Sequence, residues 1–339
     1  MRIEALPTPA LVLDADAFEH NLALMAGRLP GRRLRPHVKA HKCTSLALRQ
    51  RAYGHSSFTC ATIREVEGMV AAGLGQDLLL ANEVADASRI AALLSGAAAA
   101  AGDVRIILAV DSDATVDIAA RDGVRDVVID VNVGLPRCGC LPEDAGRLAQ
   151  RARGKGLTVH GVMGYEGHLM MVSDPAEQRD RVEASMAKLL SAHTDVGGEL
   201  ISAGGTGTHQ VNIWANEIQA GSYALMDTQY MQHPFGFRQA LGILGTVISV
   251  STKGWAVADV GLKAQGMDHG NPSIQGAEVL FCSDEHVTFR PNGERRPSVG
   301  DRIIVLPAHC DPTVACHEAM WLVRGDQVLE RWPVDLRGW

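Results

Sequence analysis

The sequence predicts an α/β protein: a (β/α)8 barrel of the TIM type with a C-terminal β-rich domain. Three observations lead to this prediction. Short apolar segments alternate with amphipathic helical segments along most of the chain. Several of the apolar runs, such as DVVIDV, lack polar alternation, as parallel strands covered on both faces do. Beyond about residue 241 the helical periodicity disappears and short strands remain.

Eight strand candidates recur at a spacing of roughly 20 to 40 residues, which fits successive βα units. Eight such units in about 220 residues is typical of a (β/α)8 barrel, whereas a doubly wound sheet usually has fewer strands. The predicted strands cover residues 34–38, 57–61, 77–81, 104–111, 126–133, 157–163, 199–203 and 217–220. The predicted helices between them include residues 63–72, 114–121, 142–154 and 175–193.

The domain boundary is expected where the rhythm changes, after the turn-prone HPFGF stretch. We therefore assign residues 18–238 to the barrel. The β-rich domain is expected to comprise residues 1–17 and 239–339, because the opening segment LPTPALVLD is extended and precedes the first helix. A chain of 339 residues is long enough for two domains.

Composition excludes several function classes. A net charge of −7 offers no basic surface for nucleic acid. The seven cysteines are odd in number and irregular in spacing, which argues against a disulfide framework and for a reducing compartment. The N-terminus lacks a signal-peptide pattern, and the apolar run at 90–101 is too short to span a bilayer. We expect a cytoplasmic protein with no membrane or nucleic-acid partner.

The first predicted strand ends in the basic segment RPHVKAHK. In a barrel the reactive groups lie at the carboxyl ends of the strands. A lysine that points into a barrel has its charge paired or its pKa lowered, and a lowered pKa is what Schiff-base chemistry requires. A solvated basic loop explains the cluster equally well. On an extended segment, side-chain alternation places His37, Lys39 and His41 on one side, near Arg35 and Lys42.

Polar residues also follow the later strands. Arg137 lies just beyond the fifth strand, and Tyr165, Glu166 and His168 follow the sixth. The seventh and eighth strands end in the glycine-containing segments SAGGTGTH and QAGSY. Two neighbouring glycine loops at these strand ends form the usual phosphate site of the fold. The sequence therefore predicts an anion site there.

A second candidate site lies near the C-terminus, in the segment PAHCDPTVACHE. His309 and Asp311 are separated by one residue, so on an extended segment both project to the same side, as two ligands of one metal must. Imidazole and carboxylate suit Mn²⁺, Zn²⁺ or a similar divalent ion. A polar turn closed by Pro312 is the alternative explanation.

Together these motifs resemble the D-threonine aldolase and D-serine dehydratase-like family, fold-type III enzymes that use pyridoxal 5′-phosphate (PLP) and are relatives of alanine racemase. The resemblance covers the whole chain, and its most specific parts are the lysine and His-x-Asp motifs. The landmarks occur in order: TPALVLDADAFEHNL, RPHVKAHK, DLLLANEV, VNVGLPRCG, GYEGHL, GGTGT, IQAGSYALMD, PAHCDPTV and ERWPVDLRGW.

The resemblance implies a role for each candidate residue. Lys39 carries PLP as a Schiff base, Arg137 approaches the phenolic oxygen of the cofactor, and Tyr165 lies at its pyridine nitrogen. His309 and Asp311 bind a divalent metal, Mn²⁺ first, with Zn²⁺, Mg²⁺ and Co²⁺ as the other candidates. The resemblance also implies a homodimer with shared active sites. The residues that hold the cofactor phosphate are Gly204, Gly205, Thr206, Gly221, Ser222 and Tyr223.

The implied activity is a metal-dependent aldolase that cleaves D-β-hydroxy-α-amino acids, such as D-threonine or 3-hydroxy-D-aspartate, to glycine and an aldehyde. His168 is a candidate for the base that takes the β-hydroxyl proton. A dehydratase acting on D-serine or 3-hydroxyaspartate is the alternative. In this family His-x-Asp tends to accompany aldolases and His-x-Cys dehydratases, which favours the aldolase, whereas RPHVK looks as much like the dehydratase branch.

Two further alternatives belong to other classes. A non-catalytic PLP carrier shares the barrel, but such proteins resemble the barrel alone, and this chain has a β-rich segment with its His-x-Asp motif. A barrel hydrolase that uses the metal without PLP leaves Lys39 unexplained.

Overall fold

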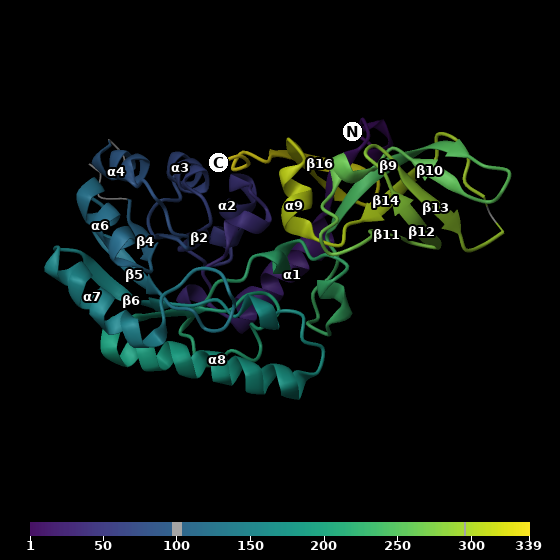
Figure 1. Ribbon diagram of the computed structural model, residues 1–339. Coiled ribbons are helices and arrows are strands. Elements are labelled where there is room, and N and C mark those ends of the chain that lie inside the picture. Colours follow the sequence, from purple (N-terminus) through teal and green to yellow (C-terminus); the bar gives the residue numbers. More distant parts are fainter. Residues whose placement is uncertain (97–103, 295) are drawn as a thin grey trace. The chain divides into compact units, whose positions relative to one another are not determined.

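A computed structural model describes residues 1–96, 104–294 and 296–339 (Figure 1). The end of the predicted apolar run, residues 97–101, lies outside the described residues. The chain divides into two compact units. The parallel unit comprises Ala26–Lys39, Ala47–Gly221 and Leu336–Trp339, and the antiparallel unit comprises Met1–Met25, Ala40–Leu46 and Ser222–Asp335.

The parallel unit is built on a seven-stranded sheet whose strands follow one another in chain order, each pair parallel. The predicted succession of βα units is thereby confirmed. The strands are β2 (Phe58–Cys60), β3 (Leu78–Leu80), β4 (Ile106–Val110), β5 (Asp126–Asp130), β6 (Thr158–Met163), β7 (Leu200–Ala203) and β8 (Glu217–Ile218). The helices are α3 (Ile63–Ala71), α4 (Ser88–Ser95), α6 (Asp113–Asp122), α7 (Ala145–Gly154) and α8 (Pro175–Val196), and α2 (Thr44–Ala52) ends in this unit.

The predicted first strand, residues 34–38, is not a regular strand of this sheet, but it contacts both edges. Leu34 forms an isolated parallel bridge with Ile218 of β8, and His37 forms another with Thr59 of β2. Pro36 has no N–H to donate, and the chain then turns into the 3-10 helix Val38–Ala40, so pairing does not extend. Seven of the eight predicted strands are therefore regular strands of this sheet. The segment 34–37 forms isolated bridges to its two edge strands instead, and we call it the bridging segment.

Local sequence signals explain where the helices of the parallel unit begin and end. Ser112 caps α6 by accepting the Thr115 N–H in a capping box, and Gly123 ends this helix at a φ of +84°. All five residues of β4 are buried, as its uninterrupted apolar sequence IILAV predicts. The core at the sheet includes Leu79, Ile107, Ala109, Val128 and Met163.

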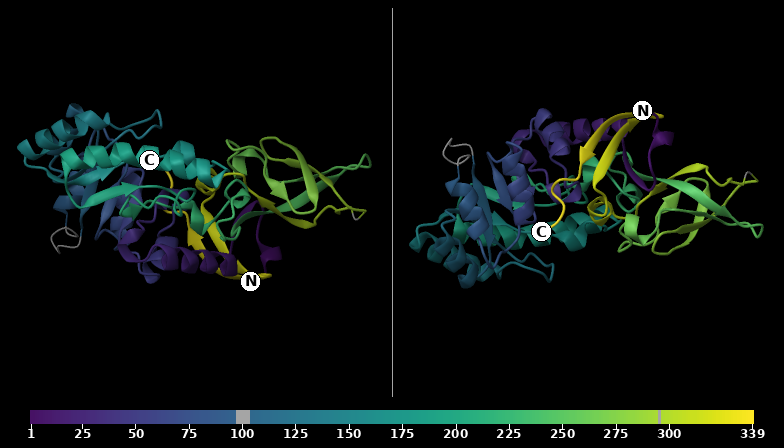
Figure 2. Two further views of the ribbon diagram at one scale, coloured as in Figure 1. Left: turned by 90° about the horizontal axis from the view of Figure 1, so that it is seen from below. Right: turned by 90° about the horizontal axis from the view of Figure 1, so that it is seen from above.

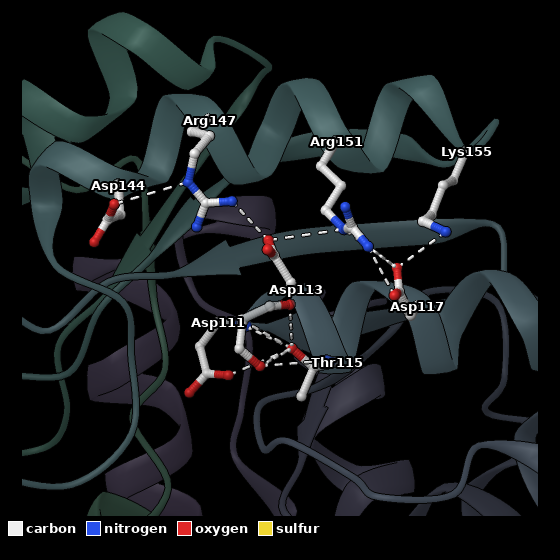
Figure 3. A network of polar contacts seen from close by, with 9 residues as sticks. Asp111, Asp113, Thr115, Asp117, Asp144, Arg147, Arg151 and Lys155 are labelled. Atoms are coloured by element: carbon white, nitrogen blue, oxygen red, sulfur yellow. Dashed lines mark hydrogen bonds and ion pairs between the residues drawn. The ribbon is translucent and has the colours of Figure 1, made fainter.

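The outer helices α6 and α7 are joined by a network of ion pairs (Figure 3). Arg147 of α7 lies 2.7 Å from Asp113 of α6, and both Arg151 and Lys155 reach Asp117, at 2.7 and 3.0 Å. These side chains are between a third and three fifths exposed, so solvent screens each pair and its contribution to stability is small. Among the described residues, no helix combines the length and the apolar composition that crossing a bilayer requires.

The antiparallel unit contains a six-stranded ring, in which β9 (Leu241–Val250) pairs with both β10 (Ala256–Ala258) and β14 (Arg302–Leu306) (Figure 2). The ring continues through β13 (Val287–Pro291), β12 (Ala277–Cys282) and β11 (Ser273–Ile274). The predicted change to short antiparallel strands is confirmed.

Three further strands extend this sheet from β9. They are β1 (Ala10–Asp14), β15 (Ala319–Arg324) and β16 (Gln327–Pro333). β1 pairs antiparallel with β9 and parallel with β15, so the opening segment forms part of this sheet. Helix α1 (Ala15–Arg28) follows β1, and the short α9 (Cys310–Ala315) precedes β15.

Candidate functional site

The carboxyl end of the bridging segment 34–37 positions Lys39. This lysine lies in the 3-10 helix Val38–Ala40 and is half-buried, and its N–H donates to Nδ1 of His37 at 3.4 Å. Because the backbone turns here, the prediction that His37, Lys39 and His41 alternate on an extended segment is wrong. Lys39 nevertheless directly follows the bridging segment, at the carboxyl end where the reactive groups of such sheets lie.

Arg35, which the sequence grouped with Lys39, lies at the opposite end of the sheet. Its guanidinium is buried and forms ion pairs with Asp77, which precedes β3, at 3.0 Å and with Glu217, the first residue of β8, at 2.8 Å. Arg105 also reaches Asp77, at 2.9 Å. Arg35 is therefore a structural residue and does not belong to the basic cluster around Lys39.

The loops after β5 and β6 bring the side chains of Arg137 and Tyr165 together. The Arg137 guanidinium carbon lies 5.3 Å from the centroid of the Tyr165 ring, a cation–π contact. The buried Asp130, the last residue of β5, lines the same small cavity. Burial and the neighbouring carboxyl of Glu83 raise the pKa of Asp130 well above its usual value.

The glycine loop after β7, residues 204–208, is buried and closely packed. Gly204 has a φ of +78°, which favours glycine, and a Cβ on Gly205 would lie 2.9 Å from Sδ of Met170. Two backbone donors predicted to face a phosphate are already used: the Gly204 N–H donates to Oε2 of Glu166, and the Gly205 N–H donates to Oγ1 of Thr208. These two N–H groups are therefore occupied by acceptors within the protein.

Glu166 is the functional residue that sequence reasoning left without a role. Its carboxylate is fully buried and accepts hydrogen bonds at 3.1 Å from the Gly204 N–H and at 2.8 Å from both Oγ1 of Thr208 and Nδ2 of Asn212. It thus fixes the start and the end of the glycine loop from the end of β6. The sequence signal was its place beside Tyr165 in GYEGH, but its partners are 38 to 46 residues away.

The second predicted phosphate loop follows β8. Since β7 and β8 are paired neighbours, the loops at their carboxyl ends begin side by side. Gly221 is buried and is the last residue of this stretch of the parallel unit. Ser222 and Tyr223 belong to the antiparallel unit, where the buried Tyr223 ring packs at 5.9 Å from Phe237.

His168, the predicted base, lies in a one-turn 3-10 helix, Gly167–Leu169, and is exposed. Partial burial, followed by the charges of Arg181 and Lys188, lowers the pKa of its imidazole. A Cβ on Gly134 would lie 3.2 Å from Nε2 of His168, so the absence of a side chain there leaves this nitrogen room. A neutral imidazole with an accessible nitrogen can accept a proton.

In the antiparallel unit, His309 and Asp311 do not lie on an extended segment, and that part of the prediction is wrong. The backbone of His309 is extended, but helix α9 begins at the next residue, Cys310. Pro312 does not prevent this, because proline is tolerated in the first turn of a helix. Asp311 Oδ1 instead accepts a hydrogen bond from Oγ of Ser222 at 3.3 Å.

His309 lies in a cluster that the sequence did not indicate. Its Nδ1 is 2.7 Å from Oδ2 of Asp268, and its ring stacks on that of His269 with centroids 3.9 Å apart. Among the described residues, Asp268, His269 and His309 form a group whose ligand atoms all lie within 4.8 Å of one another. Two imidazoles and one carboxylate are a donor set that suits a divalent transition metal.

Comparison with known families covers nearly the whole chain. Residues 13–229 match the family described as alanine racemase, N-terminal domain, and residues 240–323 match the putative serine dehydratase domain. A D-threonine aldolase from Arthrobacter sp is 35% identical over 98% of this chain and 93% of the relative. A 3-hydroxy-D-aspartate aldolase from Paracoccus denitrificans (strain Pd 1222) is 31% identical over 98% and 92%, respectively. A D-threo-3-hydroxyaspartate dehydratase from Delftia sp. (strain HT23) is 27% identical over 98% of both chains.

Solved structures give the same assignment. The crystal structure of D-threonine aldolase from Filomicrobium marinum matches with a TM-score of 0.90 and 34% identity, over 99% of this chain and 97% of that chain. Alanine racemase from Corynebacterium glutamicum matches with a TM-score of 0.66 and 16% identity over 88% and 90%, and supports the fold alone. The parallel sheet with a separate antiparallel domain is thus an alanine racemase-like fold.

Proposed function

The chain belongs to the family of D-threonine aldolases and D-serine dehydratase-like enzymes, and we propose that it cleaves D-β-hydroxy-α-amino acids of the D-threonine or 3-hydroxy-D-aspartate type to glycine and an aldehyde. It is a carbon–carbon lyase that uses PLP. The observation that carries this conclusion is the 35% identity to a D-threonine aldolase over 98% of the chain.

The residues of the parallel unit fit PLP by their chemistry. The half-buried Lys39 offers an amine just after the bridging segment, which forms isolated bridges to β8 and β2. Arg137, over the Tyr165 ring, offers a positive charge to the phenolic oxygen of the cofactor, and Tyr165 offers a neutral group to its pyridine nitrogen. When bound, PLP supplies the electron sink that lets the Cα–Cβ bond break.

Phosphate binding is proposed for the two glycine segments, Gly204–Gly205–Thr206 and Gly221–Ser222–Tyr223. Because Glu166 and Thr208 take the first two N–H groups of the first segment, Gly204 and Gly205 shape the loop, and Thr206 is the first residue whose N–H and hydroxyl are proposed as donors to the anion.

His309 and Asp311 are proposed to hold the divalent ion, of which Mn²⁺ is the first candidate. The support is their donor chemistry, one imidazole and one carboxylate within a single three-residue stretch. When bound, the ion supplies Lewis-acid polarisation of the substrate β-hydroxyl. His168 then accepts the β-hydroxyl proton at Nε2, since its lowered pKa keeps the imidazole neutral near pH 7.

Assembly and location follow the family resemblance. We propose a homodimer with shared active sites and a cytoplasmic location. Light scattering of the purified protein tests the first proposal, and a monomer at all concentrations contradicts it.

The decisive experiment is a product assay on the purified protein loaded with PLP and Mn²⁺. D-threonine and 3-hydroxy-D-aspartate are supplied separately, with and without a chelator. Release of glycine with acetaldehyde or glyoxylate, lost on chelation, is the expected result. Ammonia with a keto acid identifies the dehydratase reaction instead, with Lys39 as the base that removes the Cα proton.

Two variants test the assignments within the same assay. We expect Lys39→Ala to lose the yellow colour of the bound cofactor and nearly all activity, whereas Lys155→Ala on the surface of α7 keeps both. We expect Asp311→Ala to keep the yellow cofactor and lose metal-stimulated activity. A Lys39→Ala protein that stays yellow and active contradicts the assignment of Lys39 as the Schiff-base lysine. An Asp311→Ala protein with unchanged metal stimulation contradicts the assignment of Asp311 as a metal ligand.

A further inference from the structure

The contact between His309 and Asp268 assigns a role to a residue outside the sequence motif. His309 Nδ1 and Asp268 Oδ2 lie 2.7 Å apart, a short distance typical of a charge-assisted hydrogen bond. A carboxylate accepts and cannot donate, so the imidazole carries its hydrogen on Nδ1. The free electron pair of a neutral His309 ring is then on Nε2.

This contact is built by the backbone around it. His309 forms an isolated antiparallel bridge with Gly266, two residues before Asp268. The fully buried Thr313 joins the same two segments, because its Oγ1 accepts the Gly266 N–H at 3.0 Å and donates to the His309 carbonyl at 2.7 Å. The bridge and the two hydrogen bonds of the Thr313 hydroxyl therefore hold the loop that carries Asp268 beside His309.

Direct coordination of one ion by all three residues of the cluster conflicts with the ring geometry. The His269 and His309 rings are nearly parallel, at 4°, with centroids 3.9 Å apart. An imidazole binds a metal in its own ring plane at about 2.0–2.1 Å. Two stacked parallel rings direct their electron pairs along separate planes, so both cannot bind the same ion in this arrangement.

We propose that Asp268 is a positioning residue for the metal site. It holds His309 in the tautomer with hydrogen on Nδ1 and leaves Nε2 for the divalent ion, while the stacked His269 ring limits rotation of the His309 imidazole. Histidine ligands of metals commonly donate their second N–H to a carboxylate, which fixes the ring and raises its basicity. This inference rests on the proposed role of His309 in metal binding, but its tests need no turnover.

The first test is Mn²⁺ binding to the PLP-loaded, chelator-stripped protein, with free Mn²⁺ followed by electron paramagnetic resonance. Loss of a supporting partner of this kind weakens metal binding by about 10–100-fold, and we expect that loss for Asp268→Ala. Asp268→Asn keeps an acceptor oxygen but no charge, and since a charge-assisted bond is roughly twice as strong as a neutral one, we expect a loss of about 3–10-fold.

Asp284→Ala is the matched control, because Asp284 is also an exposed aspartate of the antiparallel unit but lies outside the cluster. It is expected to bind Mn²⁺ as the wild type does. Wild-type affinity in Asp268→Ala overturns the proposal. An Asn variant that loses as much as the Ala variant also overturns it, because Asp268 is then a direct ligand.

The second test reads the tautomer in the wild-type protein and so does not depend on the folding of an Asp268 variant. Long-range ¹H–¹⁵N spectra of histidine-labelled, metal-free protein are expected to show His309 with hydrogen on Nδ1, the signal being assigned by its absence in His309→Ala. Hydrogen on Nε2 overturns the proposal. Mn²⁺ binding and the tautomer can match the prediction in a protein that releases no glycine, in which case only the proposed reaction fails.

Discussion

The amino ends and the carboxyl ends of the parallel strands both carry charged side chains, but the two ends use them differently. At the amino ends two side chains each lie between a pair of carboxylates: Arg35 between Asp77 and Glu217, and His160 between Asp126 and Glu199. At the carboxyl ends Arg137 faces an aromatic ring and the Lys39 amine follows a turn. The fully buried carboxylate there, Glu166, is satisfied by backbone, hydroxyl and amide donors.

The difference separates the end of the sheet whose charged side chains hold the fold together from the end where ligands bind in such sheets. The amino ends of such sheets generally serve stability and the carboxyl ends serve catalysis. Here that division separates two basic residues only four positions apart in the sequence, Arg35 and Lys39.

The largest effect on stability is expected from Arg35→Met. The substitution removes the guanidinium that pairs with the buried Glu217, although the Ser202 hydroxyl still donates to this carboxylate. Asp77 retains its ion pair with Arg105. Breaking a buried ion pair from one side costs about 3–5 kcal/mol. Urea unfolding followed by circular dichroism measures this loss.

Arg147→Met is the matched control, because Arg147 pairs with Asp113 at the exposed surface (Figure 3). Its loss is expected to lower the stability much less than Arg35→Met does, because solvent screens an exposed ion pair. Below the unfolding transition, the Arg35→Met protein should keep its PLP absorbance. Equal small losses for both variants would show that the amino-end network does not stabilise the sheet.

A smaller effect is expected at the carboxyl end, from Glu166→Ala. The change leaves the Gly204 N–H, the Thr208 hydroxyl and the Asn212 amide without their buried acceptor, at a cost of about 1–3 kcal/mol. Because the glycine loop loses its anchor, PLP binding should weaken about tenfold, which corresponds to about 1.4 kcal/mol. Absorbance titration of the apoprotein with PLP measures the affinity.

Glu183→Ala, an exposed change on α8, is the control and should alter neither quantity. A Glu166→Ala protein that is less stable but binds PLP as the wild type does would assign Glu166 to the fold alone. Glu166 would then serve stability as the amino-end charges do, although it lies at the carboxyl end of the sheet.

The strands of the parallel unit could be predicted because their apolar runs are a local property of the sequence. The exceptions are also physical. Pro36 and the turn at Val38–Ala40 end regular pairing in the segment 34–37. Residues 310–315, part of which was predicted to be extended, form helix α9, whose first turn accommodates Pro312. Both cases depend on the conformation of two or three residues, which apolar periodicity does not encode.

The candidate site was predictable where its residues lie at strand ends, as Arg137 and Tyr165 do. It was not predictable where the contact spans distant segments. Glu166 meets the glycine loop 38 residues later, and Asp268 meets His309 41 residues later. Such carboxylates gain a role only from the donors that the fold brings to them.

The smallest effect is expected at the second amino-end cation, and it depends on pH. The hydrogen bond of His160 to Asp126, followed by that to Glu199, raises the pKa of the imidazole above its usual value. A raised folded-state pKa stabilises the protein fully below the unfolded pKa of about 6.5, and this contribution is lost as the pH rises through the folded pKa. Wild-type protein should therefore exceed His160→Gln in stability most at about pH 5.5 and least well above the folded pKa.

Thermal unfolding of the two proteins across this range measures the difference, with the exposed His286→Gln variant as the control. The expected gain at low pH is about 1 kcal/mol or less, since one of the two carboxylates, Glu199, is largely exposed. A stability difference that stays constant with pH would mean that His160 acts through packing. Enclosure by two carboxylates would then stabilise the amino end at the buried Arg35 but not at His160.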